Sequence, residues 1–114
     1  MKRLLIIYLG IVSLFANWGQ SAQADSILDE EVQKYTIQIE MDPKEIHAYQ
    51  KRGETYVRAQ HYLEAIIDFN RILKTDSRNE KIYFLRGEAY FGLKQWEKAL
   101  NDFDSALKIN PNNP

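Results

Sequence analysis

Residues 46–79 read IHAYQKRGETYVRAQHYLEAIIDFNRILKTDSRN, and residues 80–113 read EKIYFLRGEAYFGLKQWEKALNDFDSALKINPNN. Aligned without a gap, the two stretches share the same amino acid at 11 of 34 positions. Chance would give roughly two identities at ordinary composition. The chain therefore contains the same unit twice in succession, which is typical of a repeat architecture.

Apolar and small residues recur within each unit at intervals of three and four. Tyr83, Gly87 and Tyr90 form one such set in the second unit, and a later set begins at Ala99. This spacing places side chains on one face of an amphipathic helix. Each unit should therefore be two antiparallel helices joined by a short turn. We expect these helices over residues 45–58, 62–75, 79–92 and 96–109.

The segment before the first unit carries a weaker helical pattern. Leu28, Val32, Tyr35 and Ile39 form one apolar stripe over residues 26–41. Residues 37–41 also alternate apolar and polar side chains, as a strand would. We favour a helix, because no partner strand is visible elsewhere and an isolated strand is unstable. We expect residues 25–45 to cover the open end of the stack as a degenerate half repeat.

Residues 1–24 have the three parts of a secretory signal peptide. Lys2 and Arg3 form a basic end, an uncharged apolar run follows over residues 4–15, and Ala22 and Ala24 bracket a small-x-small site. Cleavage after Ala24 would leave a secreted or periplasmic domain with no inserted segment. The competing interpretation is an uncleaved membrane anchor over residues 4–16, which is shorter than the ~20 residues that a spanning helix needs.

Composition and motifs give no indication of catalysis. The 114 residues carry 15 basic and 16 acidic side chains and no cysteine, so a nucleic-acid partner, a thiolate metal site and a cysteine nucleophile are not expected. His47 and His61 occupy unrelated places in the repeat and have no metal-ligand spacing. We therefore predict a protein that is not an enzyme, with no catalytic residues, no metal and no cofactor.

The repeated unit resembles the tetratricopeptide repeat (TPR). The second unit matches the pattern through Tyr83, Gly87, Tyr90, Ala99, Phe103, Ala106 and Pro111. The resemblance implies an all-α fold in which antiparallel helix-turn-helix repeats stack as a short right-handed α-solenoid. It also implies a role in binding other proteins. Both units have Arg, at positions 52 and 86, where the family usually has Leu.

The family places its ligand groove on the concave side, along the first helix of each unit. Some members hold acidic chaperone tails there with a Lys and Asn clamp, but Gln50 and Phe84 stand at the Lys places and Glu54 and Glu88 at the Asn places. An extended or helical segment with apolar anchors and some Lys or Arg fits better. The groove residues that the resemblance implies are Gln50, Glu54, Val57, Arg58, Lys81, Phe84, Glu88 and Phe91.

Other charged and apolar positions lead to three further expectations. We expect Glu54 to pair with Arg58 four residues later on its helix. Asp68 and Asp102 should lie on the solvent side of the second helices. The last helix should leave Phe103, Leu107 and Ile109 available at the C-terminal end of the stack. That end could join a homodimer or a larger envelope complex, which is the structural alternative to peptide binding.

Overall fold

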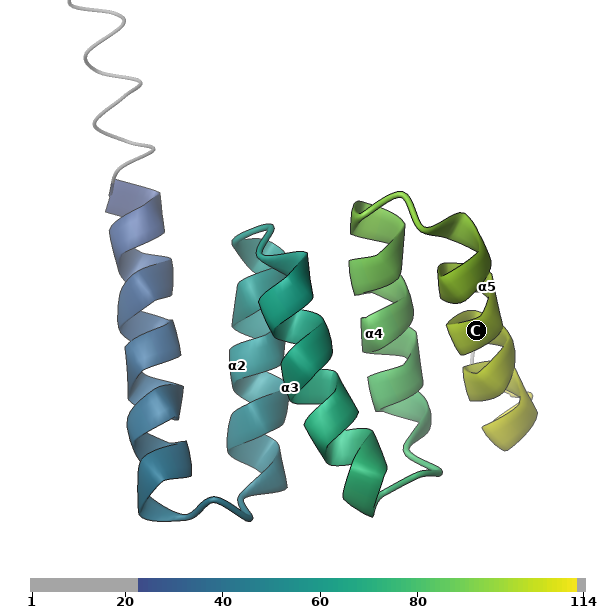
Figure 1. Ribbon diagram of the computed structural model, residues 1–114, viewed down its shortest axis with the longest axis horizontal. Coiled ribbons are helices and arrows are strands. Elements are labelled where there is room, and N and C mark those ends of the chain that lie inside the picture. The colour runs from purple at the N-terminus through teal and green to yellow at the C-terminus, as the bar shows by residue number, and fades with distance from the viewer. Residues whose placement is uncertain (1–22, 113–114) are drawn as a thin grey trace, which may run out of the picture.

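The computed structural model describes residues 23–112 of the chain, and within them it contains helices and no strands (Figure 1). An N-terminal helix runs over residues 23–41. The four helices that follow are α2 (Ile46–Arg58), α3 (Tyr62–Thr75), α4 (Glu80–Gly92) and α5 (Trp96–Ile109). Short turns join them, so neighbouring helices run in opposite directions.

The expected helices are confirmed to within a residue for α2 to α5. The N-terminal helix continues without a break through residues 37–41, so the strand interpretation of that stretch is wrong. Residues 1–22 of the predicted signal peptide lie outside the described part of the chain. No helix among residues 23–112 is long and apolar enough to cross a lipid bilayer.

The first helix of each unit begins at a polar N-cap. The Glu45 side chain accepts a hydrogen bond from the backbone N–H of His47, and the Asn79 side chain accepts one from that of Ile82. These contacts satisfy amide groups that have no partner within the helix. The first helices end at turns in which Gln60 and Lys94 both have φ of 61°, the left-handed conformation of many helix C-termini.

Each repeat is held together where a ring of its second helix meets a glycine of its first helix. A Cβ atom added to Gly53 would lie 2.5 Å from Cε1 of Phe69, and one added to Gly87 would lie 2.6 Å from Cε1 of Phe103. Any larger residue at these places would collide with the ring. The sequence assigned these glycines and aromatics to packing, and the structure confirms it.

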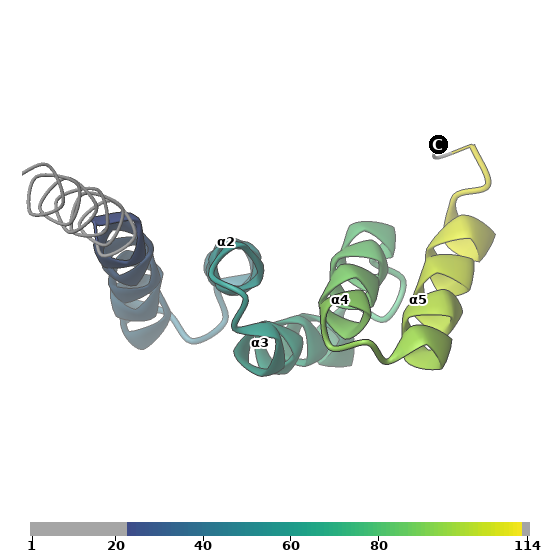
Figure 2. The same ribbon diagram turned by 90° about the horizontal axis from the view of Figure 1, so that it is seen from above.

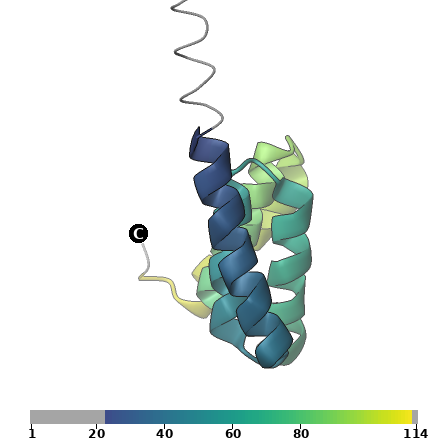
Figure 3. The ribbon, with the colours of Figure 1, turned by 90° about the vertical axis from the view of Figure 1, so that its left-hand side faces the viewer.

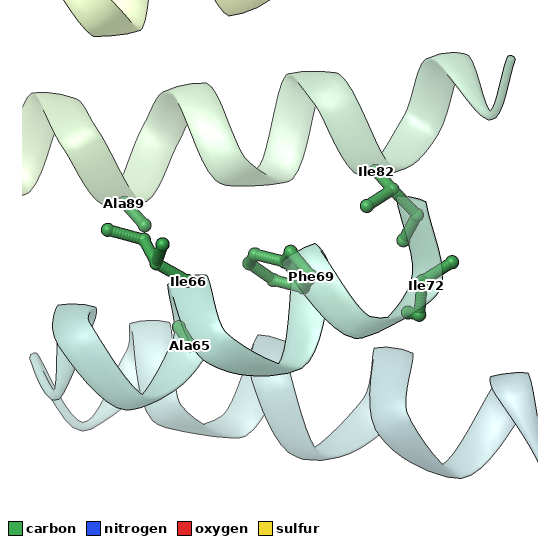
Figure 4. Packing of buried hydrophobic residues seen from close by; sticks show 6 residues of the cluster. All are labelled: Ala65, Ile66, Phe69, Ile72, Ile82 and Ala89. Atoms are coloured by element: carbon green, nitrogen blue, oxygen red, sulfur yellow. The ribbon is translucent and has the colours of Figure 1, made fainter. Parts of the chain in front are cut away.

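The core lies where the two repeats meet. Ala65, Ile66, Phe69 and Ile72 of α3 pack with Ile82 and Ala89 of α4, and all six side chains are buried (Figure 4). Helix α4 also touches α2, whereas α3 lies on the other side of the stack (Figure 2). The first helices of the two repeats are therefore neighbours on one side of the molecule.

The N-terminal helix lies beside α2 in Figure 1 and in front of it in Figure 3. Three polar contacts join it to α2. Arg52 donates to the Thr36 hydroxyl at 3.1 Å, while Arg58 and, at 3.2 Å, the Thr55 hydroxyl both donate to the Glu31 carboxylate. In the register of the repeat, Thr36 takes the position that Asn70 takes on α3. The N-terminal helix therefore occupies the place of a second helix from a preceding repeat.

Candidate protein-interaction surfaces

A pair of buried charges is repeated in both units. Arg52 donates two hydrogen bonds to the carboxylate of Asp68, at 2.9 and 2.7 Å, and Arg86 does the same to Asp102 at 2.8 and 2.7 Å. The two aspartates are only 2% and 4% exposed. The expectation that they face solvent is therefore wrong, because each is buried against an arginine from the preceding helix. These hydrogen bonds raise the pKa of both arginines.

We call the surface formed by side chains of the two first helices the α2–α4 face. Its centre is Glu54, whose carboxylate accepts a hydrogen bond from Gln50 at 3.1 Å. The Nζ atoms of Lys51 and Lys81 lie 3.5 and 3.7 Å from the same carboxylate. The contact with Lys81 crosses from α4 to α2. Three of the groove residues expected from sequence, Gln50, Glu54 and Lys81, therefore come together.

Glu88 adds a second carboxylate to this face. Partial loss of hydration raises the pKa of Glu88, and the nearby negative charge of Glu54 raises this pKa further. The negative charge of Glu54 thus disfavours ionisation of Glu88. A Lys or Arg side chain placed between them would relieve the repulsion.

Two exposed aromatic rings of α4 lie on either side of Glu88 in the sequence, on the same side of the helix. Phe84 is 44% exposed and packs against Phe103 of α5, with the two rings tilted by 46° and their centroids 5.5 Å apart. Phe91 is 58% exposed and meets the ring of Trp96 edge-on at 4.9 Å. Each ring is supported from α5 on one side and open to solvent on the other. This arrangement offers apolar contact area at low cost in side-chain entropy.

Two expected groove residues have other roles. Arg58 does not pair with Glu54: it donates to Glu31 of the N-terminal helix and, at 3.0 Å, to the hydroxyl of Thr55. The expected pairing four residues apart on α2 is wrong, because the N-terminal helix supplies a carboxylate that the pattern of α2 alone does not reveal. Val57 is partly buried and packs against the core.

Of the three residues predicted to form an interface at the C-terminal end, two are half-buried and one is exposed. Phe103 is half-buried, and its ring packs towards Gly87 and Phe84 of α4. Ile109 is also half-buried, whereas Leu107 is 48% exposed. Sequence reasoning missed Leu100, which is 59% exposed one helical turn before Asp104. Its correspondence to buried Ile66, one repeat earlier, could have identified it.

The described residues provide no constellation for metal binding. Among residues 23–112 no group of three His, Asp or Glu side chains could hold an ion. His61 precedes α3, and its ring stacks over that of Tyr56 at 6.2 Å. His47 contributes its backbone amide to the start of α2. The contacts of both histidines are therefore with residues close to them in the sequence.

Comparison with known proteins identifies the family. Two tetratricopeptide-repeat models match residues 46–79 and 80–113. The chain therefore belongs to the tetratricopeptide-repeat family and carries two repeats. No curated protein sequence matches it.

Solved structures of TPR domains share this fold. The first TPR domain of Spaghetti (RPAP3), bound to the HSP90 peptide SRMEEVD, is 28% identical with a TM-score of 0.73, covering 83% of this chain and 75% of that one. The second TPR domain of human RPAP3, in complex with the HSP70 peptide SGPTIEEVD, is 25% identical (TM-score 0.71; 85% and 81% covered). The Arabidopsis OM64 TPR domain is 26% identical (TM-score 0.72; 83% and 78% covered).

Proposed function

We propose that this chain is a protein-interaction module that acts outside the cytoplasm. Its α2–α4 face would bind a peptide or helical segment that carries Lys or Arg between apolar side chains. The two RPAP3 domains support the general role, since each is similar to this chain over most of its length and is bound to a peptide. The predicted signal peptide supports the location.

The observation that carries the ligand chemistry is the proximity of Glu54 and Glu88. Partial loss of hydration raises the pKa of Glu88, and the negative charge of Glu54 adds to this effect. A cation placed between the two carboxylates would therefore be attracted by both. Lys51 and Lys81, at 3.5 and 3.7 Å, both contact Glu54, and Glu88 has no ion pair within residues 23–112. Phe84 and Phe91 provide apolar contacts on the same helix as Glu88.

The peptides bound by the RPAP3 domains have the opposite charge. Both peptides end in Glu-Glu-Val-Asp. Such a tail would bring several carboxylates to the α2–α4 face, where Glu54 and Glu88 already repel each other. Like charges in contact oppose binding and exclude wrong partners. We therefore propose a ligand that differs in charge from those of these relatives.

Paired peptides test the proposed ligand chemistry. A fluorescent amphipathic peptide of Leu and Lys should bind the full chain, and its counterpart with Glu for Lys should not. The double variant Glu54→Gln/Glu88→Gln should weaken binding roughly tenfold, and Phe91→Ala by a similar factor, because charges and aromatic anchors dominate such interfaces. Glu64→Gln/Glu97→Gln removes the same charge from exposed sites on α3 and α5 and should leave affinity unchanged. Equal binding of both peptides would refute the proposal.

A further inference from the structure

One contact between successive repeats recurs with the period of the repeat. The Nη1 atom of Arg52 donates to the Thr36 side chain at 3.1 Å, and that of Arg86 donates to the Asn70 side chain at 2.8 Å. In both cases the first helix of a repeat reaches back to the helix before it. The next position in this series is Asp104 on α5. Asp104 is exposed and makes no hydrogen bond or ion pair with any other residue between 23 and 112.

Two apolar residues on the same side of α5 as Asp104, Leu100 and Leu107, are also exposed to solvent. Ile66 is 8% exposed, and Leu73 is half-buried against the core cluster between α3 and α4. Their counterparts on α5 are Leu100 and Leu107, which are 59% and 48% exposed. The exposed fractions differ because α4 packs against this side of α3, whereas no helix in the described part of the chain packs against the same side of α5. We call Leu100, Asp104 and Leu107 the outer face of α5.

The two helices that cover equivalent faces define what an occupant must offer. Helix α4 presents Ile82, Arg86 and Ala89, and the two apolar side chains are fully buried. Helix α2 presents a small residue, an arginine and a small residue at the same places: Ala48, Arg52 and Thr55. The pattern is an apolar or small residue, arginine four positions later, and a small residue three positions after that.

The charge of Asp104 selects between the candidate occupants. Thr36 and Asn70 accept from arginine as neutral groups, whereas a carboxylate would make a stronger, charge-assisted hydrogen bond. A second copy docked through α5 about a twofold axis would place two Asp104 carboxylates close together. A second copy docked through residues 23–41 would offer no arginine, since that helix contains none. Neither arrangement supplies an arginine to Asp104.

We propose that the outer face of α5 binds an amphipathic helix of a partner protein that presents an arginine to Asp104. The site is separate from the α2–α4 face, so one molecule could hold two partner segments. The bound helix would continue the stack in the way that α4 continues it from α3.

The probe for this site is a helix-stabilised peptide with the sequence of residues 79–93, which contains the α4 pattern. We expect it to bind the full chain and to shift the NMR methyl signals of Leu100 and Leu107. Asp104→Arg in the protein, or Arg86→Glu in the peptide, should each weaken binding roughly tenfold, the ordinary strength of a hydrogen bond between charged groups. The two changes together should restore affinity. Glu64→Arg, with the same change of charge at an exposed site on α3, should have no effect.

Several results would overturn the proposal. Equal affinity in all four peptide and protein combinations would exclude a contact with Asp104. Shifts confined to the α2–α4 face would assign the peptide to the other surface. Self-association through Leu100, seen as concentration-dependent broadening without peptide, would favour a second copy as occupant. If the free peptide does not bind, the same sequence can be joined directly after Asn113, where its local concentration reaches the millimolar range. A tethered copy that leaves the melting temperature and the Leu100 signal unchanged would rule the site out.

Discussion

Arg86 of α4 holds the carboxylate of Asp102 on α5 through two parallel hydrogen bonds of 2.8 and 2.7 Å. Arg52 and Asp68 repeat the arrangement in the first unit. Each pair joins the two helices of a repeat, and the same arginine also reaches back to the preceding helix. One side chain per repeat therefore connects three helices, so its loss affects both packing within a repeat and packing between repeats.

Removing one member of this pair should destabilise the domain strongly. Asp68→Ala would leave the guanidinium of Arg52, 18% exposed, without its main partner. We expect a loss of about 3–5 kcal/mol in the free energy of unfolding, as for other broken buried pairs. The double variant Arg52→Leu/Asp68→Ala should lose less, because no unpaired charge remains. Urea unfolding measures both, with exposed Glu64→Ala as control. A double variant less stable than the single one would contradict this account.

The two repeat glycines should differ in their tolerance of alanine. Gly→Ala within a helix is normally favourable by about 1 kcal/mol. Gly53→Ala should instead destabilise by roughly 1–3 kcal/mol, because Phe69 is fully buried and cannot move away. Gly87→Ala should cost less, since Phe103 is only half-buried and can shift towards solvent. Thermal unfolding of the two variants measures which substitution is more destabilising. A larger loss of stability for Gly87→Ala than for Gly53→Ala would show that burial of the facing ring does not control the cost.

The contact between Glu31 and Arg58 should make docking of the N-terminal helix depend on pH. The hydrogen bond from Arg58 holds the pKa of Glu31 below its ordinary 4.5. A carboxyl group with a lowered pKa in the folded state stabilises that state above its unfolded pKa, and this contribution is lost as the pH falls through the lowered value. Hydrogen exchange in residues 26–41 should therefore accelerate below pH 4.5 relative to α3. Arg58→Gln should remove the difference; an unchanged profile in that variant would exclude the contact as its cause.

Binding of a basic peptide to the α2–α4 face should weaken on acidification earlier than ordinary carboxylates would cause. Because the pKa of Glu88 is raised above 4.5, this group takes up a proton while the pH is still above that value. The protonated form no longer attracts a cation, so affinity falls as the pH approaches 4.5 from neutrality. Fluorescence titrations at a series of pH values test this. In Glu88→Gln, affinity should stay constant over the part of the pH range above 4.5 where the wild type loses it. If the variant and the wild type show the same dependence of affinity on pH, Glu88 does not contact the peptide.

Export should remove the segment 1–24. N-terminal sequencing of the mature protein should begin at Asp25 and read Asp-Ser-Ile-Leu. Ala24→Leu places a large side chain where signal processing requires a small one, and it should block cleavage. Recovery of the intact N-terminus at Met1 from a membrane fraction of the unaltered protein would support the anchor over residues 4–16 instead.

The helices and their packing glycines could be predicted because the repeat presents each pattern twice. Asp68 shows the limit of this reasoning: a charged residue in a helical pattern is normally assigned to the surface. Its burial depends on Arg52, which lies on another helix. The recurrence of Arg and Asp at that same separation, as Arg86 and Asp102, was the sign available in the sequence.

The site was less predictable than the fold because its contacts cross between helices. Lys81 reaches Glu54 only because α4 lies beside α2. Arg58 turns away from Glu54 because the N-terminal helix brings Glu31 within reach. A periodic pattern gives the face of a residue on its own helix, but it does not give the partner that the neighbouring helix places opposite.

The order in which the helices touch bears on how quickly the chain folds. Helices α2 to α5 pack against the next helix in sequence, and the one other contact among these four, between α2 and α4, spans a single repeat. Within α2 to α5, no distant segments must meet before favourable contacts form, so the entropy of loop closure is small at every step. Topologies of this kind reach the native state within microseconds to milliseconds. Folding can start in either hairpin and extend by adding one helix at a time, and unfolding can proceed from the ends inward.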